Sequence, residues 1–357
     1  MCRAGFPYIY ILVFVYLVVS CHASIGDRTQ FFHNCRQNCE RQNCSADGIE
    51  IQEQAIKYYQ QSIFDKAFAW NCADECQYGC MWRTVDAFAE RGWDVPQFYG
   101  KWPFVRFLGM QEPASVLFSI LNLIAHIRWL RRFRTEVRPD SPCYKLWHIF
   151  SFICINGWIW SAVFHTRDFP VTELMDYAFA YSIVLVSLYC MIMRCVKLLI
   201  YKLLKILKTN LIFFRFAYRM LHRRSIILRG LISLIFLSFF VNYFAYLSLG
   251  KFSYSLNMTT NMITGALSAL GWLVWSYLER HRRPNYRKII RFYILFGMSM
   301  SLELLDFPPI LWLLDAHALW HLATVPVISV FYDFIIDDCR LLRKEKQYDD
   351  EKYRKHI

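Results

Sequence analysis

Charged residues are scarce in this chain of 357 residues. Lys, Arg, Asp and Glu together make up 19% of it, whereas soluble domains contain roughly 25%. Glycine (13) and proline (11) are also few, which excludes a collagen-like or low-complexity chain. Hydrophobic residues reach 56%, which excludes general disorder. The composition therefore predicts a membrane protein that crosses the bilayer several times.

Long apolar runs follow one another from Pro113 onward. Each run is close to the roughly 20 residues that a bilayer requires. We predict an all-α membrane protein with seven transmembrane helices in a domain at 113–336, followed by a cytosolic tail at 337–357. The seven predicted spans are 113–130, 146–165, 171–193, 228–248, 258–278, 290–307 and 310–335.

The net charge of +13 is compatible with nucleic-acid binding, so the position of the basic residues decides its meaning. Ten Lys or Arg lie between Arg194 and Arg229, in one predicted loop, whereas the short loops on the other side of the spans contain only Arg167 and Lys251. Basic residues collect on the cytosolic side of membrane proteins. We therefore predict a lumenal N-terminal domain and a cytosolic C-terminus, and we do not expect nucleic-acid binding.

The basic segment 196–224 has two interpretations. Lys202, Lys205 and Lys208 recur every three residues among Leu and Ile. This pattern is compatible with an amphipathic helix on the cytosolic leaflet. A solvated basic connector fits it equally well, and we assign no chemistry to the segment.

The first 23 residues resemble a secretory signal peptide. Arg3 supplies a positive start, residues 8–20 are apolar, and Ala23 is a small residue suited to cleavage. An uncleaved anchor is the alternative interpretation. Either one delivers the following segment to the lumen.

Residues 24–112 form a polar segment that is rich in cysteine. In an oxidising lumen, an even number of cysteines indicates a disulfide framework, whose pairing the sequence leaves open. Zinc binding is the alternative, but the segment has no paired C-x-x-C motif. A glycosylation sequon at Asn43-Cys44-Ser45 is compatible with lumenal exposure. The six cysteines are Cys35, Cys39, Cys44, Cys72, Cys76 and Cys80.

Five polar residues lie in predicted spans, where such residues are rare and usually functional. Ser161 and His165 lie at the end of the second span, and Asp176 lies about one turn into the third. His317 and His321 lie two to three turns into the predicted seventh span. An i,i+4 spacing aligns each pair on one helix face. We expect all five side chains at the lumenal level of the membrane.

Three histidines with nearby oxygen groups are typical of a catalytic zinc site, which has three protein ligands and an open position for water. We predict that His165, His317 and His321 bind zinc. Asp176 would accept a proton from the attacking water, and Ser161 would orient that water or the developing oxyanion. In one alternative, the histidines only form hydrogen bonds between helices. In another, Ser161 is a nucleophile with His165 as its base.

This pattern resembles the signature of a hydrolase superfamily that includes the alkaline ceramidases and the progestin/adipoQ-type receptors. Within that superfamily, the chain is similar to the GPI fatty-acid remodelling factors over nearly its whole length. The segments that carry the similarity are Trp70-Asn-Cys72-x3-Cys76-x3-Cys80-Met-Trp82, Gln97-Phe-Tyr-Gly-Lys101-Trp-Pro-Phe104, Val163-Phe-His165-Thr-Arg-Asp168, Leu302-Glu-Leu-Leu-Asp306-Phe-Pro-Pro309 and Leu314-Asp-Ala-His317.

The resemblance implies a seven-helix enzyme with a three-histidine zinc site. Its expected reaction is phospholipase A2-type removal of the unsaturated sn-2 fatty acid from GPI-anchored proteins, on the lumenal side of the Golgi or endoplasmic reticulum membrane. The alternatives are a ceramidase-like amidohydrolase, a non-catalytic seven-helix receptor, and a chaperone or manganese-homeostasis factor of the secretory pathway. Glu303 and Asp306 are candidates to orient a ligating histidine, or to pair with another polar group in the bundle.

Overall fold

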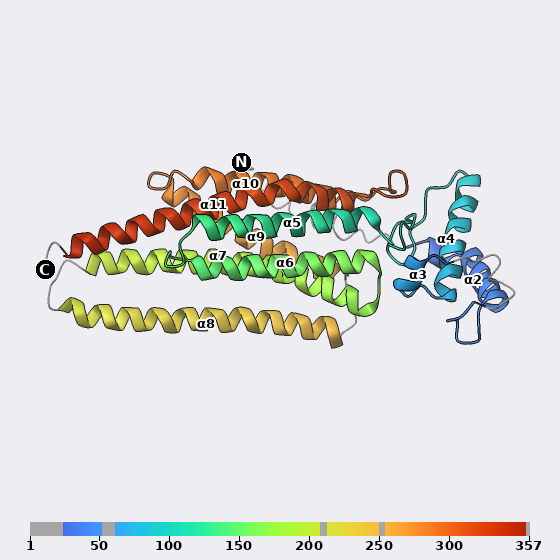
Figure 1. The fold of residues 1–357 in the computed structure, drawn as a ribbon, viewed down its shortest axis with the longest axis horizontal. Coiled ribbons are helices and arrows are strands. Elements are labelled where there is room, and N and C mark those ends of the chain that lie inside the picture. The colour runs from blue at the N-terminus through green and yellow to red at the C-terminus, as the bar shows by residue number, and fades with distance from the viewer. Residues whose placement is uncertain (1–23, 52–60, 208–212, 250–253, 355–357) are drawn as a thin grey trace, which may run out of the picture. The chain divides into compact units, whose positions relative to one another are not determined.

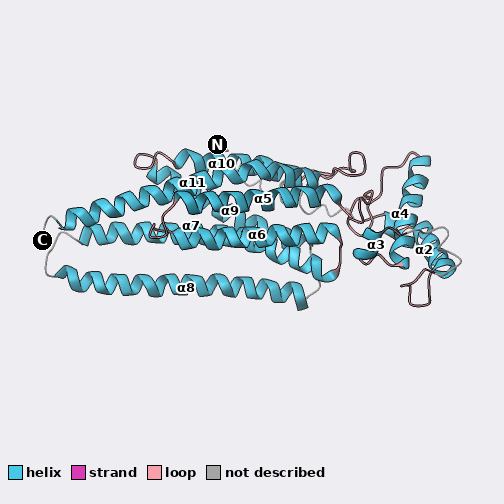
Figure 2. Cartoon of the chain, viewed as in Figure 1, coloured by secondary structure: helices cyan, strands magenta, loops and turns pink. Residues whose placement is uncertain are grey.

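The computed structural model describes residues 24–51, 61–207, 213–249 and 254–354. Within these ranges, helices make up most of the chain and no strand is present (Figures 1 and 2), so the all-α prediction is confirmed. The predicted signal peptide at 1–23 lies outside the described residues. Most of the side chains of the basic segment 196–224 also lie outside them, so its two interpretations stay open.

The chain divides into two compact units. The first consists of Met1–Phe118, Ala162–Asp168 and Met300–His321. The second consists of Ser119–Ser161, Phe169–Ser299 and Leu322–Ile357. The first unit thus combines the cysteine-rich segment with one end each of four long helices, and the three predicted metal ligands belong to it.

The cysteine-rich segment folds around two antiparallel helices, α2 (Gln30–Asn43) and α4 (Cys72–Glu90), with η1 (Gly26–Arg28) and α3 (Ile63–Ala67) beside them in the sequence. Thr29 caps α2, and Asn71 with Asp74 forms a capping box at the start of α4. Cys35 and Cys39 lie on one face of α2, and Cys44 directly follows this helix. Cys72, Cys76 and Cys80 lie on one face of α4. Because the two helices are antiparallel, the first cysteine of one group pairs with the last of the other. The pairs are Cys35–Cys80, Cys39–Cys76 and Cys44–Cys72.

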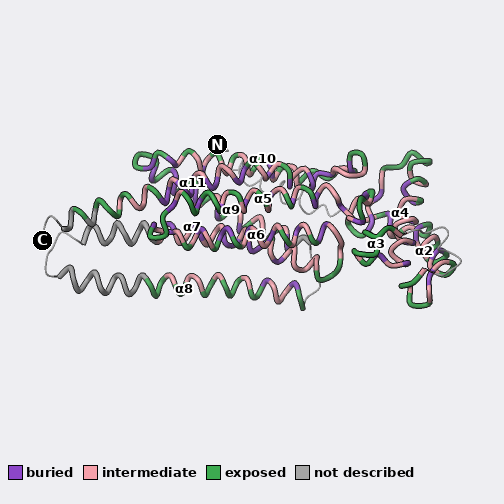
Figure 3. The backbone as a smooth tube through the Cα atoms, viewed as in Figure 1, coloured by how far each residue is buried: buried purple, intermediate pink, exposed green. Residues whose placement is uncertain are grey.

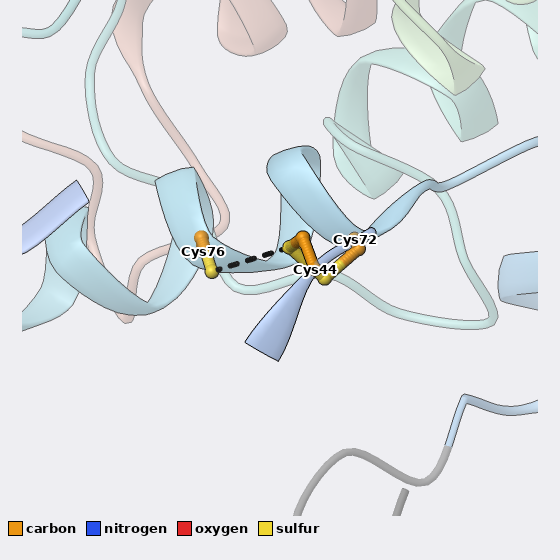
Figure 4. A group of neighbouring side chains, drawn as sticks. All are labelled: Cys44, Cys72 and Cys76. Carbon is orange, nitrogen blue, oxygen red and sulfur yellow. Dashed lines mark hydrogen bonds between the residues drawn. A yellow bond between two sulfur atoms is a disulfide. The ribbon is translucent and has the colours of Figure 1, made fainter. Parts of the chain in front are cut away.

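Three of these sulfurs also meet the spacing of a metal site. The Sγ atoms of Cys44, Cys72 and Cys76 lie within 4.8 Å of one another (Figure 4). However, Cys44 is bonded to Cys72, and Cys76 is bonded to Cys39. Metal ions bind thiolates, and a disulfide sulfur carries no such charge. The structure therefore confirms the predicted disulfide framework and does not favour zinc at these cysteines.

Seven long helices follow the cysteine-rich segment: α5 (Pro113–Glu136), α6 (Tyr144–Thr166), α7 (Pro170–Leu207), α8 (Phe213–Leu249), α9 (Tyr254–Glu279), α10 (Tyr286–Glu303) and α11 (Ala316–Arg354). Among the described residues, five stretches are long and apolar enough to cross a membrane: Pro113–Glu136, Tyr144–Thr166, Pro170–Val196, Ile226–Leu249 and Ala316–Tyr348.

The predicted count of seven spans is not confirmed. The fifth and sixth predicted spans do form helices, α9 and α10, but neither is among the five apolar stretches. In α10, which has 18 residues, Arg287, Lys288 and Arg291 occupy the first two turns and shorten the apolar part. The structure thus supports a multi-pass membrane protein with at least five candidate spans among the described residues.

The core of the second unit is aromatic. Trp147, Trp272, Tyr332 and Phe334 are fully buried, and the rings of Trp272 and Phe334 pack edge to face with centroids 5.1 Å apart. Helix α7 packs against both α8 and α9. Most residues of α8 from Ile226 to Leu249 are exposed (Figure 3), and this stretch is apolar, which is the surface expected of a helix that faces lipid.

Two predicted span boundaries are wrong, and both matter for the site. Helix α10 ends at Glu303 rather than at residue 307, and α11 begins at Ala316 rather than at residue 310. Pro308 and Pro309 interrupt helix between them, because proline cannot donate a backbone hydrogen bond. Asp315 then caps α11 by accepting a hydrogen bond of 2.8 Å from the N–H of Ala318. His317 and His321 consequently lie in the first two turns of α11, not two to three turns into a span.

Candidate metal centre

The three predicted ligands come together in the first unit. His165 lies near the end of α6, and His317 and His321 lie near the start of α11. One ring nitrogen from each of the three falls within 4.8 Å of the others, and the Nε2 atoms of His165 and His317 are 3.4 Å apart. His165 and His321 are buried, with 3% and 2% of their surface exposed, and His317 is partly exposed. This group has the composition and spacing of a metal-binding site.

Glu112 orients the first of these histidines, and our sequence analysis missed it. Its Oε2 atom lies 2.6 Å from Nδ1 of His165, and its backbone N–H donates a hydrogen bond of 3.0 Å to the carbonyl of the same residue. Glu112 is 5% exposed. It directly precedes Pro113, the first residue of α5. The sequence did contain a signal for it, a carboxylate directly before a long apolar run, because such a group needs a partner when the end of the span is buried.

Lys101 brings a positive charge from the cysteine-rich segment to this carboxylate. Its Nζ atom lies 2.9 Å from Oε1 of Glu112 and 2.9 Å from Asp168, and it also lies 4.2 Å from the ring centre of Phe164. Burial alone would lower the pKa of Lys101, but the two carboxylates raise it above its usual value. Burial alone would raise the pKa of Glu112, yet Lys101 and His165 hold it below its usual range. Both groups therefore stay charged at neutral pH.

Glu303 holds the second histidine in the same way. As the last residue of α10, it places Oε2 2.8 Å from Nδ1 of His317. A histidine that donates its Nδ1–H to a carboxylate keeps its Nε2 lone pair for a metal. Two rings are therefore fixed with their Nε2 atoms facing each other. His321 forms a hydrogen bond to the backbone of Ser115.

Ser161, Asp176 and Asp306 are the remaining predicted site residues. Ser161 lies one turn before His165 on α6, and its Oγ atom is 3.1 Å from that of Ser119. Asp176 lies in the second turn of α7 and is partly buried. Both belong to the second unit, so their catalytic roles stay predictions. Asp306 accepts hydrogen bonds from the side chains of Gln97 (3.1 Å) and Trp102 (2.7 Å), and thus anchors the segment after α10 to the cysteine-rich segment.

A stack of charged and aromatic side chains fixes the chain just after His165. The guanidinium groups of Arg106 and Arg167 lie 3.8 and 3.6 Å from the ring centre of Trp70. Arg106 pairs with Glu75 at 2.9 Å, and Arg167 pairs with Asp74 at 2.6 Å. Both carboxylates lie in the first turn of α4. The disulfide-bonded helices therefore hold the end of α6 that carries His165, a predicted metal ligand.

The comparison with known proteins identifies the family. Residues 62–339 match the Per1-like family, a stretch that includes the second half of the cysteine-rich segment and all three histidines. The chain belongs to this family. The predicted similarity to GPI fatty-acid remodelling factors is thereby confirmed.

Individual Per1-like relatives are similar over almost their whole length. "Post-GPI attachment to proteins factor 3" of Drosophila melanogaster is 65% identical over 319 residues, which are 89% of this chain and 90% of that protein. "GPI-specific phospholipase A2-like PGAP3" is 39% identical in Mus musculus, over 90% of this chain and 91% of that protein. The Homo sapiens protein of the same name is 38% identical, over 91% and 92%. No solved structure matches the chain.

Proposed function

We propose that this protein is a membrane-embedded zinc hydrolase that removes the sn-2 fatty-acyl chain from the lipid of GPI-anchored proteins. The observation that carries the proposal is the convergence of His165, His317 and His321, with a carboxylate behind each of the first two. The relatives named for GPI-specific phospholipase A2-like activity supply the substrate class and the bond.

The donor set fits zinc. Two nitrogens at the usual zinc distance of about 2.0–2.1 Å from a tetrahedral ion lie about 3.3 Å from each other. The Nε2 atoms of His165 and His317 are 3.4 Å apart. Because Glu112 and Glu303 engage the Nδ1 atoms of these two rings, the facing Nε2 lone pairs of neutral imidazoles repel each other unless a metal cation or a shared proton lies between them. Imidazole is also a ligand type that zinc prefers.

Each residue of the site has a separate role in the proposed reaction. A zinc ion held by the three histidines would supply a Lewis acid that activates water and polarises an ester carbonyl. Asp176 accepts the proton that the attacking water loses, and Ser161 donates a hydrogen bond that orients the water or the developing oxyanion. Glu112 and Glu303 keep two imidazole rings in the required tautomer and orientation.

The test combines metal content with hydrolysis by purified protein. The wild type should contain about one zinc per chain and release fatty acid from the sn-2 position of a GPI lipid in vesicles. His317→Ala should lose both the zinc and the activity. Asp176→Asn should keep the zinc and lose activity by about 10²–10⁴-fold, because the proton acceptor is gone. His281→Ala, an exposed histidine between α9 and α10, is the matched control and should keep both.

Three outcomes would contradict the proposal. Full zinc occupancy in both His317→Ala and His321→Ala would exclude the proposed ligands. Unchanged hydrolysis by Asp176→Asn and Ser161→Ala would exclude the catalytic roles proposed for these two residues. Release of fatty acid from ceramide but not from GPI lipid would move the protein to the amidohydrolase alternative, since a metal site of this kind does not itself distinguish an ester from an amide.

A further inference from the structure

Two turns in the first unit end in exposed apolar side chains, and each lies immediately before an apolar span. In one, Phe107 and Met110 form an antiparallel bridge; in the other, Ile310 and Leu314 do. The first turn is followed by α5, which begins at Pro113, and the second by α11, which begins at Ala316. The chain therefore carries both turns to the boundary of the membrane.

Each turn has a leucine at a position where turns exposed to water usually have glycine or asparagine. Leu108 and Leu311 have φ angles of 50° and 55°, in the left-handed region that glycine and asparagine usually occupy. Leu311 is nevertheless 79% exposed and Ile310 54%. An apolar residue at such a position is strained, and Leu311 gains little burial from the protein in return. The turns belong to two segments, 105–112 and 303–315, whose exposed large apolar residues are Val105 (41%), Phe107 (58%), Leu108 (48%), Leu304 (42%), Leu305 (53%), Ile310 and Leu311.

The two segments are held together and are attached to the metal centre. The N–H of Val105 donates a hydrogen bond of 3.0 Å to the carbonyl of Trp312, which links the two turns. Glu112 closes the first segment and contacts His165, and Glu303 opens the second and contacts His317. The apolar side chains thus belong to the same two loops that position the ligands.

We propose that these turns insert their apolar tips into the leaflet that borders the cysteine-rich segment. A lipid surface is the occupant we favour, because each tip is joined to a membrane span by only a few residues and burial in lipid would offset its exposed apolar area. The nearby cations do not suggest attraction to acidic lipids, since Arg106 and Arg167 are paired with Glu75 and Asp74. Burial of apolar side chains therefore drives the insertion, and the insertion holds the metal centre at the depth of the headgroup–acyl boundary.

The experiment places an environment-sensitive fluorophore at each tip. Leu108→Cys and Leu311→Cys are labelled with a nitrobenzoxadiazole dye on full-length protein in vesicles of phosphatidylcholine. Trp93→Cys is the matched control, because Trp93 follows α4, is 59% exposed and lies far from any span in the sequence. Unsubstituted protein corrects for labelling of native thiols. Fluorescence is quenched either by lipids with a doxyl group on the acyl chain or by aqueous iodide.

We expect doxyl lipids to quench both tips at least twofold more than the control, and iodide to quench the control more than the tips. If Leu311→Cys does not fold, Ile310→Cys gives a second position in the same turn. Folding is judged by electrophoretic mobility under non-reducing conditions, which shows whether the native disulfides have formed. Strong iodide quenching at both tips, with no lipid quenching, would overturn the proposal. Quenching that requires anionic lipid would also overturn it, because charge rather than apolar burial would then drive the contact. None of these quenching results depends on whether the protein hydrolyses a GPI lipid, so they test the insertion separately from the proposed function.

Discussion

At the scale of single residues, the ring orientation of the histidines is decided by their neighbours. His165 and His317 each face a carboxylate through Nδ1, at 2.6 and 2.8 Å. Glu112 is further held by Lys101 at 2.9 Å. A positively charged residue of the cysteine-rich segment thus contacts His165, a predicted metal ligand, through one intermediate side chain. This gives Glu112 and Lys101 a positioning role in the site.

Glu112→Gln should weaken metal binding without unfolding the protein. Glutamine is nearly the same size but carries no charge, so it holds the imidazole less firmly and makes it a poorer ligand. Loss of such an orienting carboxylate typically costs about 10–100-fold in metal affinity or activity. Competition for zinc with a chelator of known affinity measures the change. Glu90→Gln, at an exposed position in α4, is the control, and equal zinc affinity in the two variants would contradict the role.

At the scale of elements, the start of α11 is the critical point, because two predicted metal ligands, His317 and His321, lie in its first two turns. Asp315 sets that start through its hydrogen bond to the N–H of Ala318. Burial raises the pKa of Asp315 above its usual value, while His317 and the hydrogen bond from Ala318 oppose this shift. The disulfides act in a comparable way on α4, since this helix carries Asp74 and Glu75, which pair with Arg167 and Arg106.

Asp315→Ala should shift the first turn of α11 and release zinc more readily, whereas Asp315→Asn should not. Alanine at a helix N-cap costs about 0.5–2 kcal/mol, and asparagine caps as well as aspartate. The rate of zinc loss to excess chelator is the measurement for both variants. If alanine and asparagine gave the same rate, a charge effect and not the cap would explain the result.

At the scale of the whole molecule, a buried ion pair joins the far parts of two long helices in the second unit. Arg194 of α7 contacts Asp338 of α11 through two hydrogen bonds of 2.6 and 2.8 Å, and neither side chain is exposed. Arg283, in the loop between α9 and α10, lies 3.6 Å from the same carboxylate. Asp338 thus connects three segments that are distant in the sequence.

Arg194→Met should destabilise the bundle by about 3–5 kcal/mol, because it leaves Asp338 with less compensation for its buried charge. Asp338→Leu should be at least as severe, since it affects both arginines. The double variant Arg194→Met/Asp338→Leu should recover much of the loss, because no unpaired charge from this pair remains. Thermal unfolding in detergent, followed by tryptophan fluorescence, compares the three. A double variant as unstable as the sum of the single variants would show that the pair is not coupled.

Much of the fold was predictable because its causes are local. Apolar runs of about 20 residues predict membrane helices, and five of the seven predicted spans correspond to apolar helices in the structure. Six cysteines in a segment that is predicted to be lumenal indicate disulfides, and all six are paired. The spans predicted at 258–278 and 290–307 form helices that are not among these apolar stretches, and in α10 three basic residues in the first two turns shorten the apolar part.

The sequence by itself determined the residue types of the site, and the tertiary structure decided which of them meet. The i,i+4 spacing of His317 and His321 already places both on one helix face, because helical periodicity is a property of the local chain. Contact between His165, Glu112 and Lys101 depends on loops whose path no periodicity describes. Likewise, Asp306 binds Gln97 and Trp102 rather than remaining in a span, because Pro308 and Pro309 end the helix before it. Side chains that are distant in the sequence meet only when packing and burial select one arrangement of these loops.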